Sequence, residues 1–516
     1  MLYFLTMTST SKLKFALLGI AFMALGGQVA NGQSGEATVS IDISKTYQTI
    51  SNFAASDAWA CQFVGNWPDS KRDKIADLLF SMDSNPDGSP KGIGLSLWRF
   101  NIGGGSTQQG DASGIKDEWR RAESFLNEDG SYNWQNQAGQ VWFLKAAKQR
   151  GVNQFLGFTN TPPVQFTTNG KAFANGGKVN IAPDKYDAFA AFLANTVKGI
   201  KKVSNVNLNY ISPVNEPQWD WSDGGQEGCP YTNTEIAGLA RAIDKKFSEA
   251  NIGSKVLLAE AGSINYLFTA GDKPGKGSQV ADFFRSGSPN YIGALPNVSP
   301  VIAAHSYFST SPMASSVEAR RKLADTIATI KGLSFWQSEY CILGDNAGEI
   351  DGNKRDLGIN SALYLASVIH TDLAVANASA WQWWTALSAY DYKDGLIYVD
   401  KNKTDGTFYT SKMLWAFGNY SRFVRPGAVR VNAEVSAEAG KGLMVSAFKK
   451  DKALTVVIIN PTANAIAVNL NSGTAKVQFG ASYLTSQTAE LKPGKITGNN
   501  SVIPPRSVLT ITGIIK

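Results

Sequence analysis

Residues 184–216 carry the pattern that decides the fold, and they read DKYDAFAAFLANTVKGIKKVSNVNLNYISPVNE. The first part is amphipathic, because its apolar residues recur every three or four positions, as one buried face of a helix requires. Asp184 follows Pro183 and can cap this helix. The second part, Leu208–Val214, is mainly apolar, as in a buried strand. A helix followed by a buried strand is the repeating unit of an α/β fold.

The same alternation runs from residue 49 to residue 424. We expect strands at Thr49–Ala54, Leu95–Ile102, Gln154–Thr159, Leu208–Val214, Lys255–Glu260, Val301–Ser306, Ser334–Glu339 and Ala378–Trp384. Eight strands, each followed by helical material, predict a (β/α)8 TIM barrel, with a doubly wound open sheet as the alternative. In a barrel, catalytic residues lie at the carboxyl ends of the strands.

The two ends of the remaining chain show a different pattern. After Arg425-Pro426-Gly427, short strands separated by Gly, Pro and Asn turns predict an antiparallel β-sandwich over residues 425–516. The strands that we expect there are Leu443–Phe448, Leu454–Asn460, Ile466–Leu470, Lys476–Phe479 and Ser507–Thr512. Ala37–Ile43 alternates in the same way. We therefore expect residues 33–48 to join the C-terminal domain as an added strand.

The first 32 residues have the features of an export signal. Lys12 and Lys14 precede an apolar run, Phe15–Leu25, and the small-residue pattern Ala30-Asn31-Gly32 follows. We expect cleavage before Gln33 and a secreted protein, either extracellular or periplasmic. No later run reaches the roughly 20 apolar residues that a membrane span needs, so no membrane span is predicted.

The composition narrows the classes of partner. The net charge of +7 is small for 516 residues and no block of like charge concentrates it, so nucleic-acid binding is not predicted. Two His residues make a His-rich metal site impossible, and we expect no metal, no cofactor and a monomer. The 13 Trp residues point to surfaces that stack on flat ligands. Three cysteines, Cys61, Cys229 and Cys341, allow one disulfide and a free thiol, with the pairing left open.

Two glutamates stand at the ends of predicted strands. Glu216 follows Tyr210-Ile-Ser-Pro-Val-Asn215, and Glu339 ends Phe335-Trp336-Gln-Ser. A single Glu at a strand end is more often a solvated rim residue. Two of them, on the fourth and seventh barrel strands, match the pair of carboxyl groups that glycoside hydrolysis needs. Asn215, next to the first, is suited to hold a sugar hydroxyl.

Other polar and aromatic residues fall at the ends of the remaining strands and are candidate sugar contacts: Asp57, Trp59, Arg99, Asn101, Asn160, His305, Tyr307 and Trp384. Trp and Tyr stack on sugar faces, while Asp, Asn and Arg fix hydroxyl groups. Arg99 has the alternative of being a buried ion-pair partner of a strand carboxylate. His305 has the alternative of being a satisfied core histidine.

Seven motifs together resemble glycoside hydrolase family 30, and in particular its endo-β-1,6-galactanases. They are Asn52-Phe-Ala-Ala-Ser-Asp57-Ala-Trp59, Leu97-Trp-Arg99-Phe-Asn101-Ile-Gly-Gly-Gly105, Ile211-Ser-Pro-Val-Asn-Glu-Pro-Gln218, Gln226-Glu-Gly-Cys-Pro230, His305-Ser-Tyr307, Trp336-Gln-Ser-Glu-Tyr-Cys341 and Trp381-Gln-Trp-Trp384. The resemblance implies a retaining double displacement with Glu216 as acid/base and Glu339 as nucleophile. It also implies a β-1,6-galactan substrate.

The sequence departs from the family pattern at two places and leaves several functions open. Gln165 stands where an aromatic residue is common, and Phe53-Ala54 where Phe-Gly is usual. Related alternatives are a β-1,6-glucanase, a β-xylanase, and an exo-acting β-galactosidase or β-fucosidase. A glycan-binding protein without turnover is an alternative of another class, and so is an independent binding module at the C-terminus. The loops Trp219–Pro230 and Asp345–Arg355 are expected to decide between endo and exo action.

Overall fold

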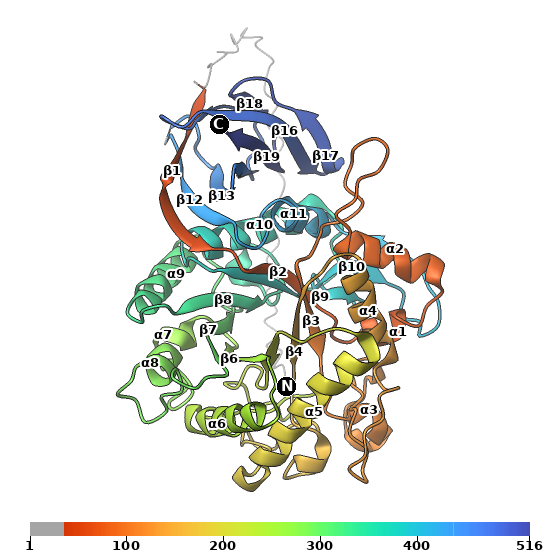
Figure 1. The fold of residues 1–516 in the computed structure, drawn as a ribbon. Helices are drawn as coiled ribbons and strands as arrows, with labels where there is room; N and C mark the ends of the chain where they lie inside the picture. The colour runs from red at the N-terminus through yellow and green to blue at the C-terminus, as the bar shows by residue number, and fades with distance from the viewer. Residues whose placement is uncertain (1–35, 437) are drawn as a thin grey trace, which may run out of the picture. The chain divides into compact units, whose positions relative to one another are not determined.

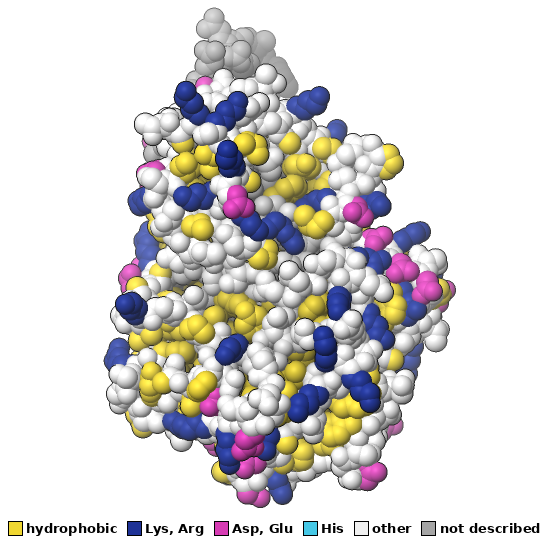
Figure 2. All heavy atoms as spheres, viewed as in Figure 1, with side chains coloured by type: hydrophobic (Ala, Val, Ile, Leu, Met, Phe, Trp, Pro, Cys, Tyr) yellow, Lys and Arg dark blue, Asp and Glu magenta, His cyan; other side chains and the backbone are white. Residues whose placement is uncertain are grey.

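The computed structural model describes residues 36–436 and 438–516. The predicted signal peptide, residues 1–32, lies outside the described residues. Among the described residues, none of the helices combines the length and the apolar character needed to cross a membrane. On the face seen in Figure 2, Lys and Arg side chains are spread among uncharged and acidic ones and do not gather in one patch.

A closed barrel of eight parallel strands forms the larger part of the described chain (Figure 1). Its strands are β2 (Asn52–Ser56), β3 (Leu97–Asn101), β4 (Gln154–Phe158), β5 (Tyr210–Ser212), β6 (Lys255–Ala261), β7 (Val298–His305), β8 (Ser334–Glu339) and β9 (Ala380–Ser388). Each pairs with the next, and β9 pairs with both β8 and β2, which closes the ring. The predicted TIM barrel is confirmed, and the open sheet is excluded.

Two further strands extend the sheet beyond β9. β10 (Gly395–Val399) pairs parallel with β9, and β11 (Phe408–Thr410) pairs antiparallel with β10. The barrel strands are buried along their length, apart from Gln154 on β4, Tyr210 on β5, the first residues of β6 and β8, and Pro300 and Val301 on β7. Strands that are covered on both faces are expected when helices surround a parallel sheet.

The helices cover the outside of the barrel (Figure 1). They are α1 (Cys61–Val64), α2 (Asp69–Phe80), α3 (Ser106–Gln109), α4 (Ala138–Gln149), α5 (Tyr186–Ser204), α6 (Asn233–Glu249), α7 (Asn265–Phe268), α8 (Gln279–Phe284), α9 (Met313–Ala328), α10 (Ile359–Ala374) and α11 (Lys412–Ser421). The predicted cap of α5 is wrong, because Asp184 lies within a separate 3-10 turn, Pro183–Lys185. A capping box that was not predicted starts α6, where Thr232 and Glu235 bond each other's backbone.

The second domain is one curled, mainly antiparallel sheet. Its strands are β1 (Ala37–Thr49), β12 (Val429–Val435), β13 (Met444–Lys450), β14 (Ala453–Asn460), β15 (Ile466–Asn471), β16 (Val477–Ser486), β17 (Ala489–Lys495), β18 (Asn500–Ile503) and β19 (Ser507–Ile515). As expected, β1 joins this domain, antiparallel to β12 and parallel to β15. Val39 on β1, Val468 on β15 and Leu509 on β19 share one core, so the sheet folds over itself.

Helices α10 and α11 lie between the barrel strands and this sheet (Figure 1). Asn419 on α11 donates from Nδ2 to the Tyr483 carbonyl at 3.0 Å and to Thr510 Oγ1 at 2.9 Å. Arg430 on β12 donates to Asn377 Oδ1 at 2.7 Å, in the turn before β9. These polar contacts fix the side domain against the barrel.

A buried ion pair ties the helices to the strands that carry the site. Arg320 on α9 and Asp372 on α10 are both fully buried and meet at 2.7 Å. Asp372 also accepts hydrogen bonds from Ser306, just after β7, and from Trp381 on β9. Arg320 donates to the Ser309 carbonyl at 2.6 Å. The pair therefore holds the carboxyl end of β7 and the start of β9 in place.

Replacing one partner of this pair is expected to destabilise the fold. Asp372→Ala leaves the Arg320 guanidinium buried and unpaired, which costs about 3–5 kcal/mol of unfolding free energy. Urea unfolding at neutral pH measures the loss. Glu318→Ala on the exposed face of α9 is the matched control and should change stability by at most about 0.5 kcal/mol. A loss below about 1 kcal/mol for Asp372→Ala would contradict the role given to the pair.

Candidate active site

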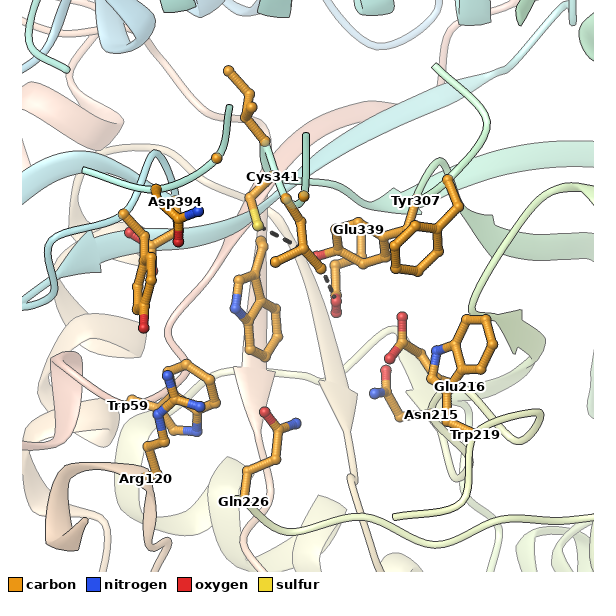
Figure 3. Close-up of a pocket in the computed structure, with 18 of the residues that line it drawn as sticks. Trp59, Arg120, Asn215, Glu216, Trp219, Gln226, Tyr307, Glu339, Cys341 and Asp394 are labelled. Carbon is orange, nitrogen blue, oxygen red and sulfur yellow. Dashed lines mark hydrogen bonds between the residues drawn. The ribbon is translucent and has the colours of Figure 1, made fainter. Parts of the chain in front are cut away.

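A cavity of about 550 Å³ opens at the carboxyl ends of the barrel strands (Figure 3). Six residues predicted from the sequence line it: Trp59, Asn215, Glu216, Tyr307, Glu339 and Trp384. They come from the ends of β2, β5, β7 and β8 and, for Trp384, from the middle of β9. The parallel strands of a barrel bring their ends to one rim, which explains why residues so far apart in sequence meet here.

Glu216 and Glu339 face each other across the cavity (Figure 3). A carboxylate oxygen of each and a ring nitrogen of His305 all lie within 4.8 Å of one another. Both carboxylates are nearly buried, with 7% of Glu216 and 3% of Glu339 exposed. A separation of this size matches the roughly 5–5.5 Å of a carboxyl pair in which one group attacks and the other transfers a proton.

Glu339 is held by a cation and a phenol. Arg99 on β3 donates from Nη1 to Glu339 Oε2 at 2.5 Å. Tyr307 donates from its hydroxyl to Glu339 Oε1 at 3.1 Å. The guanidinium also packs over the Phe158 ring, 3.7 Å from its centroid. Arg99 thus takes the predicted alternative of a buried ion-pair partner, and it stabilises the negative charge on Glu339 without lining the cavity.

Glu216 is paired with His305. His305 Nδ1 lies 2.8 Å from Glu216 Oε1 and 3.5 Å from Glu339 Oε1. Burial raises the pKa of Glu216, and the negative charge of Glu339 raises it further, while the bond to His305 opposes both. Glu216 is therefore suited to hold a proton at neutral pH and to lose it when Glu339 is neutralised.

A third buried carboxylate, Glu260 at the end of β6, was not predicted as a site residue. Its Oε2 lies 3.1 Å from His305 Nε2, 3.7 Å from Arg99 Nη2 and 2.5 Å from Ser338 Oγ. Burial alone would raise its pKa, but Arg99 and His305 lower it to about 2. The signal in the sequence is the Glu that ends Leu257-Leu-Ala-Glu260, a third strand-end glutamate.

His305 has a carboxylate on each ring nitrogen, Glu216 at Nδ1 and Glu260 at Nε2. Only the imidazolium donates from both nitrogens. Burial alone would lower the pKa of His305, but the charge of Glu339 and the bonds to Glu216 and Glu260 raise it to about 10. The alternative of an ordinary core histidine does not fit these contacts.

Besides Arg99 and His305, three predicted residues do not line the cavity: Asp57, Asn101 and Asn160. Asp57 is fully buried, and its Oδ1 accepts hydrogen bonds from the Asn101 backbone at 2.7 Å and from Gln140 Nε2 at 3.2 Å. Burial raises its pKa to about 8. Gln137 donates to the Asn101 carbonyl, so the start of α4 covers this corner. The sugar contacts of these three residues stay predictions.

The loops add wall residues that were not predicted. Trp219, Trp221 and Gln226 come from the loop after β5. Arg120, which packs over the Trp59 ring, and Asp394 lie on the opposite side of the cavity (Figure 3). The residue after Gln226 anchors that loop: buried Glu227 accepts from the Gly104 and Ser106 backbones at 2.9 and 3.1 Å. The signal for this wall was the pair Trp219 and Trp221, three and five residues after Glu216.

Several residues of this rim have left-handed backbone conformations, which non-glycine residues seldom adopt. They are Trp59 (φ 62°), Glu216 (φ 44°), Trp221 (φ 53°), Glu260 (φ 54°) and Phe308 (φ 56°). Such conformations cost free energy and persist where the surrounding structure imposes them, often at functional sites. Their concentration at the ends of the strands supports the assignment of the cavity as the active site.

The cysteines form no disulfide. Cys61, Cys229 and Cys341 are all free and buried, so the bridge that their number allowed is absent. Cys341 lines the cavity with its Sγ 3.7 Å from the Tyr307 hydroxyl. Glu216, His305 and Glu339 are, within residues 36–436 and 438–516, the one group of three that could share a metal ion. Each of the three is already engaged by a neighbouring side chain, as described above.

Removing the charge of Glu260 is expected to weaken the cationic state of His305. Glu260→Gln should lower the pKa of His305 well below the value of about 10 that three carboxylates support. The raised pKa of His305 stabilises the fold fully below its unfolded value of about 6.5, and the stabilisation is lost as the pH rises through about 10. The variant should therefore lose part of this stabilisation of the fold at neutral pH.

The chain has only two histidines, so NMR of the imidazole rings measures this directly. His370, with a pKa lowered to about 4 by burial, gives the second signal and is assigned by a His370→Gln variant. Glu249→Gln, at an exposed ion pair on α6, is the matched control and should leave both signals in place. An unchanged titration of His305 in Glu260→Gln would contradict the role given to Glu260.

The chain is similar to several known proteins. The model of O-glycosyl hydrolase family 30 matches residues 36–398. An endo-beta-1,6-galactanase of Hypocrea rufa is 23% identical over 432 residues, which cover 80% of each chain. Glucuronoxylanase XynC of Bacillus subtilis (strain 168) is 25% identical over 390 residues, 73% of this chain and 77% of that protein.

A solved structure, that of a conserved exported protein from Bacteroides fragilis, is similar over nearly the whole described chain. It has a TM-score of 0.85 at 36% identity and covers 92% of this chain and 100% of that one. The family match spans well over half of the sequence, as the seven motifs predicted. The chain therefore belongs to glycoside hydrolase family 30 and is a glycoside hydrolase.

Proposed function

We propose that this glycoside hydrolase is an exported, retaining enzyme that cleaves β-1,6-galactan within the chain. The observation that carries the proposal is the pair Glu216 and Glu339, whose carboxylate oxygens lie within 4.8 Å of each other in a cavity at the barrel rim. This separation leaves Glu339 close enough to attack the anomeric carbon while Glu216 reaches the leaving oxygen.

In the first step, Glu339 attacks the anomeric carbon and Glu216 gives its proton to the departing glycosidic oxygen. Arg99 and Tyr307 orient the two oxygens of Glu339, so the nucleophile is fixed before the substrate binds. Burial and the charge of Glu339 keep Glu216 protonated. His305 donates to Glu216 Oε1, which leaves Oε2 to carry the proton.

In the second step, Glu216 takes a proton from water, and the water attacks the glycosyl-enzyme. Glu339 is then an ester without charge, so its part in raising the pKa of Glu216 is gone. The hydrogen bond from cationic His305 lowers that pKa further and stabilises the carboxylate. The same residue thus serves as acid and then as base.

The sugar and the linkage rest on similarity rather than on the site. The relative named as an endo-beta-1,6-galactanase aligns over 80% of this chain, which supports β-1,6-galactan. The glucuronoxylanase aligns over 73% at 25% identity, so glucuronoxylan is the second candidate. A binding protein without turnover is disfavoured because both carboxylates are present and held by partners.

Export rests on the leader before Gln33, which lies outside the described residues. The Lys-flanked apolar run and the small residues that follow support removal by a signal peptidase. We place the mature enzyme outside the cytoplasm, extracellular or periplasmic, as a monomer. Sequencing of the N-terminus of the released protein tests the cleavage site.

Replacing either carboxyl group should have a distinct effect. Glu216→Gln is expected to lower kcat/KM on a natural glycoside by about 10²–10⁴-fold, because the leaving oxygen loses its proton donor. The loss should be much smaller for a dinitrophenyl glycoside, whose leaving group needs no proton. Wild-type kcat/KM should fall as the pH rises through the raised pKa of Glu216, and this alkaline fall should vanish in the variant.

Glu339→Gln should lose about 10⁴-fold or more on both substrates, because no nucleophile remains. Full activity of Glu339→Gln would refute the nucleophile assignment. If the decrease of kcat/KM at alkaline pH disappeared in Glu339→Gln but remained in Glu216→Gln, Glu339 would be the acid/base and Glu216 the nucleophile.

The substrate is tested by product analysis on linear β-1,6-galactan, with β-1,6-glucan and glucuronoxylan in parallel. An early ladder of galacto-oligosaccharides is the expected result, and NMR of the first product should show the β-anomer. Galactose or one disaccharide from the start would refute endo action. Release from glucan or xylan alone would refute the galactan assignment.

A further inference from the structure

Two aromatic side chains stand together at the mouth of the cavity on the side of Glu216. Trp219 lies three residues after Glu216, and Phe308 lies three residues after His305, the last residue of β7. Their ring centroids lie 5.9 Å apart at an interplanar angle of 90°. We propose that Trp219 and Phe308 form a platform that binds the sugar ring on the leaving-group side of the scissile bond.

Trp219 is fixed in position before any ligand binds. Its indole packs against Gly262, where an added Cβ would lie 2.4 Å from Trp219 Nε1. Gln218 accepts a hydrogen bond from the Gly262 backbone at 3.0 Å, which keeps the two segments together. Tyr266 meets the indole edge-on at 5.9 Å. A preorganised ring loses little conformational freedom when a sugar stacks on it.

Phe308 is exposed in a way that core packing does not explain. Its side chain is 65% exposed, although it lines the cavity. Its backbone φ of 56° lies in the left-handed region, which is unfavourable for a bulky residue. A large apolar ring that is held in a strained conformation and shown to solvent beside a cavity is typical of a binding surface.

The position of the platform assigns its ligand, and this step rests on the proposed role of Glu216 as acid. Glu216 and Trp219 lie on one side of the cavity, whereas Trp59, Arg120 and Asp394 lie on the other (Figure 3). The oxygen that Glu216 protonates belongs to the departing sugar. That sugar must therefore lie beside Trp219, while the sugar attacked by Glu339 extends toward Trp59.

The chemistry of the platform fits a pyranose ring. Sugar rings present apolar C–H faces, and aromatic side chains line most sites that bind small organic ligands. Phe308 has no polar atom, so it contributes contact area without a preference for particular hydroxyl groups. An endo-acting enzyme needs such a surface beyond the cleaved bond, because the departing part of the chain is itself a sugar polymer.

The test compares two donors and uses a matched control. One donor is a series of linear β-1,6-galacto-oligosaccharides labelled at the reducing end, in which sugar units occupy the leaving-group side. The other is the corresponding glycosyl fluoride, which places no sugar there. The variants are Phe308→Ala, Phe308→Tyr, which keeps a ring, and Tyr409→Ala, which removes an exposed ring on β11 outside the cavity.

For Phe308→Ala we expect kcat/KM on the oligosaccharides to fall about tenfold more than kcat/KM on the fluoride, as when a central aromatic contact is truncated. The cleavage positions should stay as in the wild type, because every productive binding mode places the departing sugar on the platform. Phe308→Tyr should restore most of the loss, and Tyr409→Ala should match the wild type on both donors.

Equal losses of kcat/KM on the oligosaccharides and on the fluoride would overturn the proposed platform. The sugar assignment fails separately: if the wild-type enzyme cleaves gluco- or xylo-oligosaccharides and not the galactan series, the same ratio is measured on the series that it cleaves. The ratio of the kcat/KM losses on the oligosaccharide and on the fluoride therefore tests the platform whichever sugar the enzyme binds.

Discussion

The balance of charge inside the barrel rim is the constraint on which the rest of the site depends. Two cations, Arg99 and His305, and three carboxylates, Glu216, Glu260 and Glu339, share a volume that is almost closed to solvent. An unpaired charge is very costly in such a place. With Glu216 protonated, two positive charges face two negative ones, and the cluster is neutral. Without Glu260, Arg99 and His305 would have only the negative charge of Glu339 opposite them, and the buried cluster would carry one unbalanced positive charge.

The same balance holds through the reaction that we propose. When Glu339 becomes an ester it loses its negative charge, and Glu216 gains one by giving up its proton. The sum is unchanged, and only the site of the charge moves, by the short distance that separates the two carboxylates. Arg99 is bonded to Glu339 and His305 to Glu216, so each of the two groups keeps a cation beside it. The buried cluster therefore requires no ion from solvent when the covalent bond forms.

Most of the cluster could be predicted from the sequence because it lies on strands. Glu216, Glu339, Arg99 and His305 each end or nearly end an apolar run, and the barrel brings such ends together whatever the helices do. Glu260 has the same signal, but its partners lie on β3, β7 and β8, and sequence spacing does not give contacts across a barrel. The burial of Asp57 beneath Gln140 depends on how α4 packs, which is a tertiary effect.

The remaining differences come from loops and turns, where local sequence is a weaker guide. Trp221 and Phe308 line the cavity with backbone conformations that their residue types do not favour. The strands β12, β17 and β18 were not predicted, since their sequences carry Lys, Asn and Glu at the positions exposed to water. The strands thus position the charged groups of the site, while the loops supply aromatic walls of the cavity. This division predicts that substrate preference and chemical competence depend on separate sets of residues, because a change in a wall leaves the buried charge balance intact.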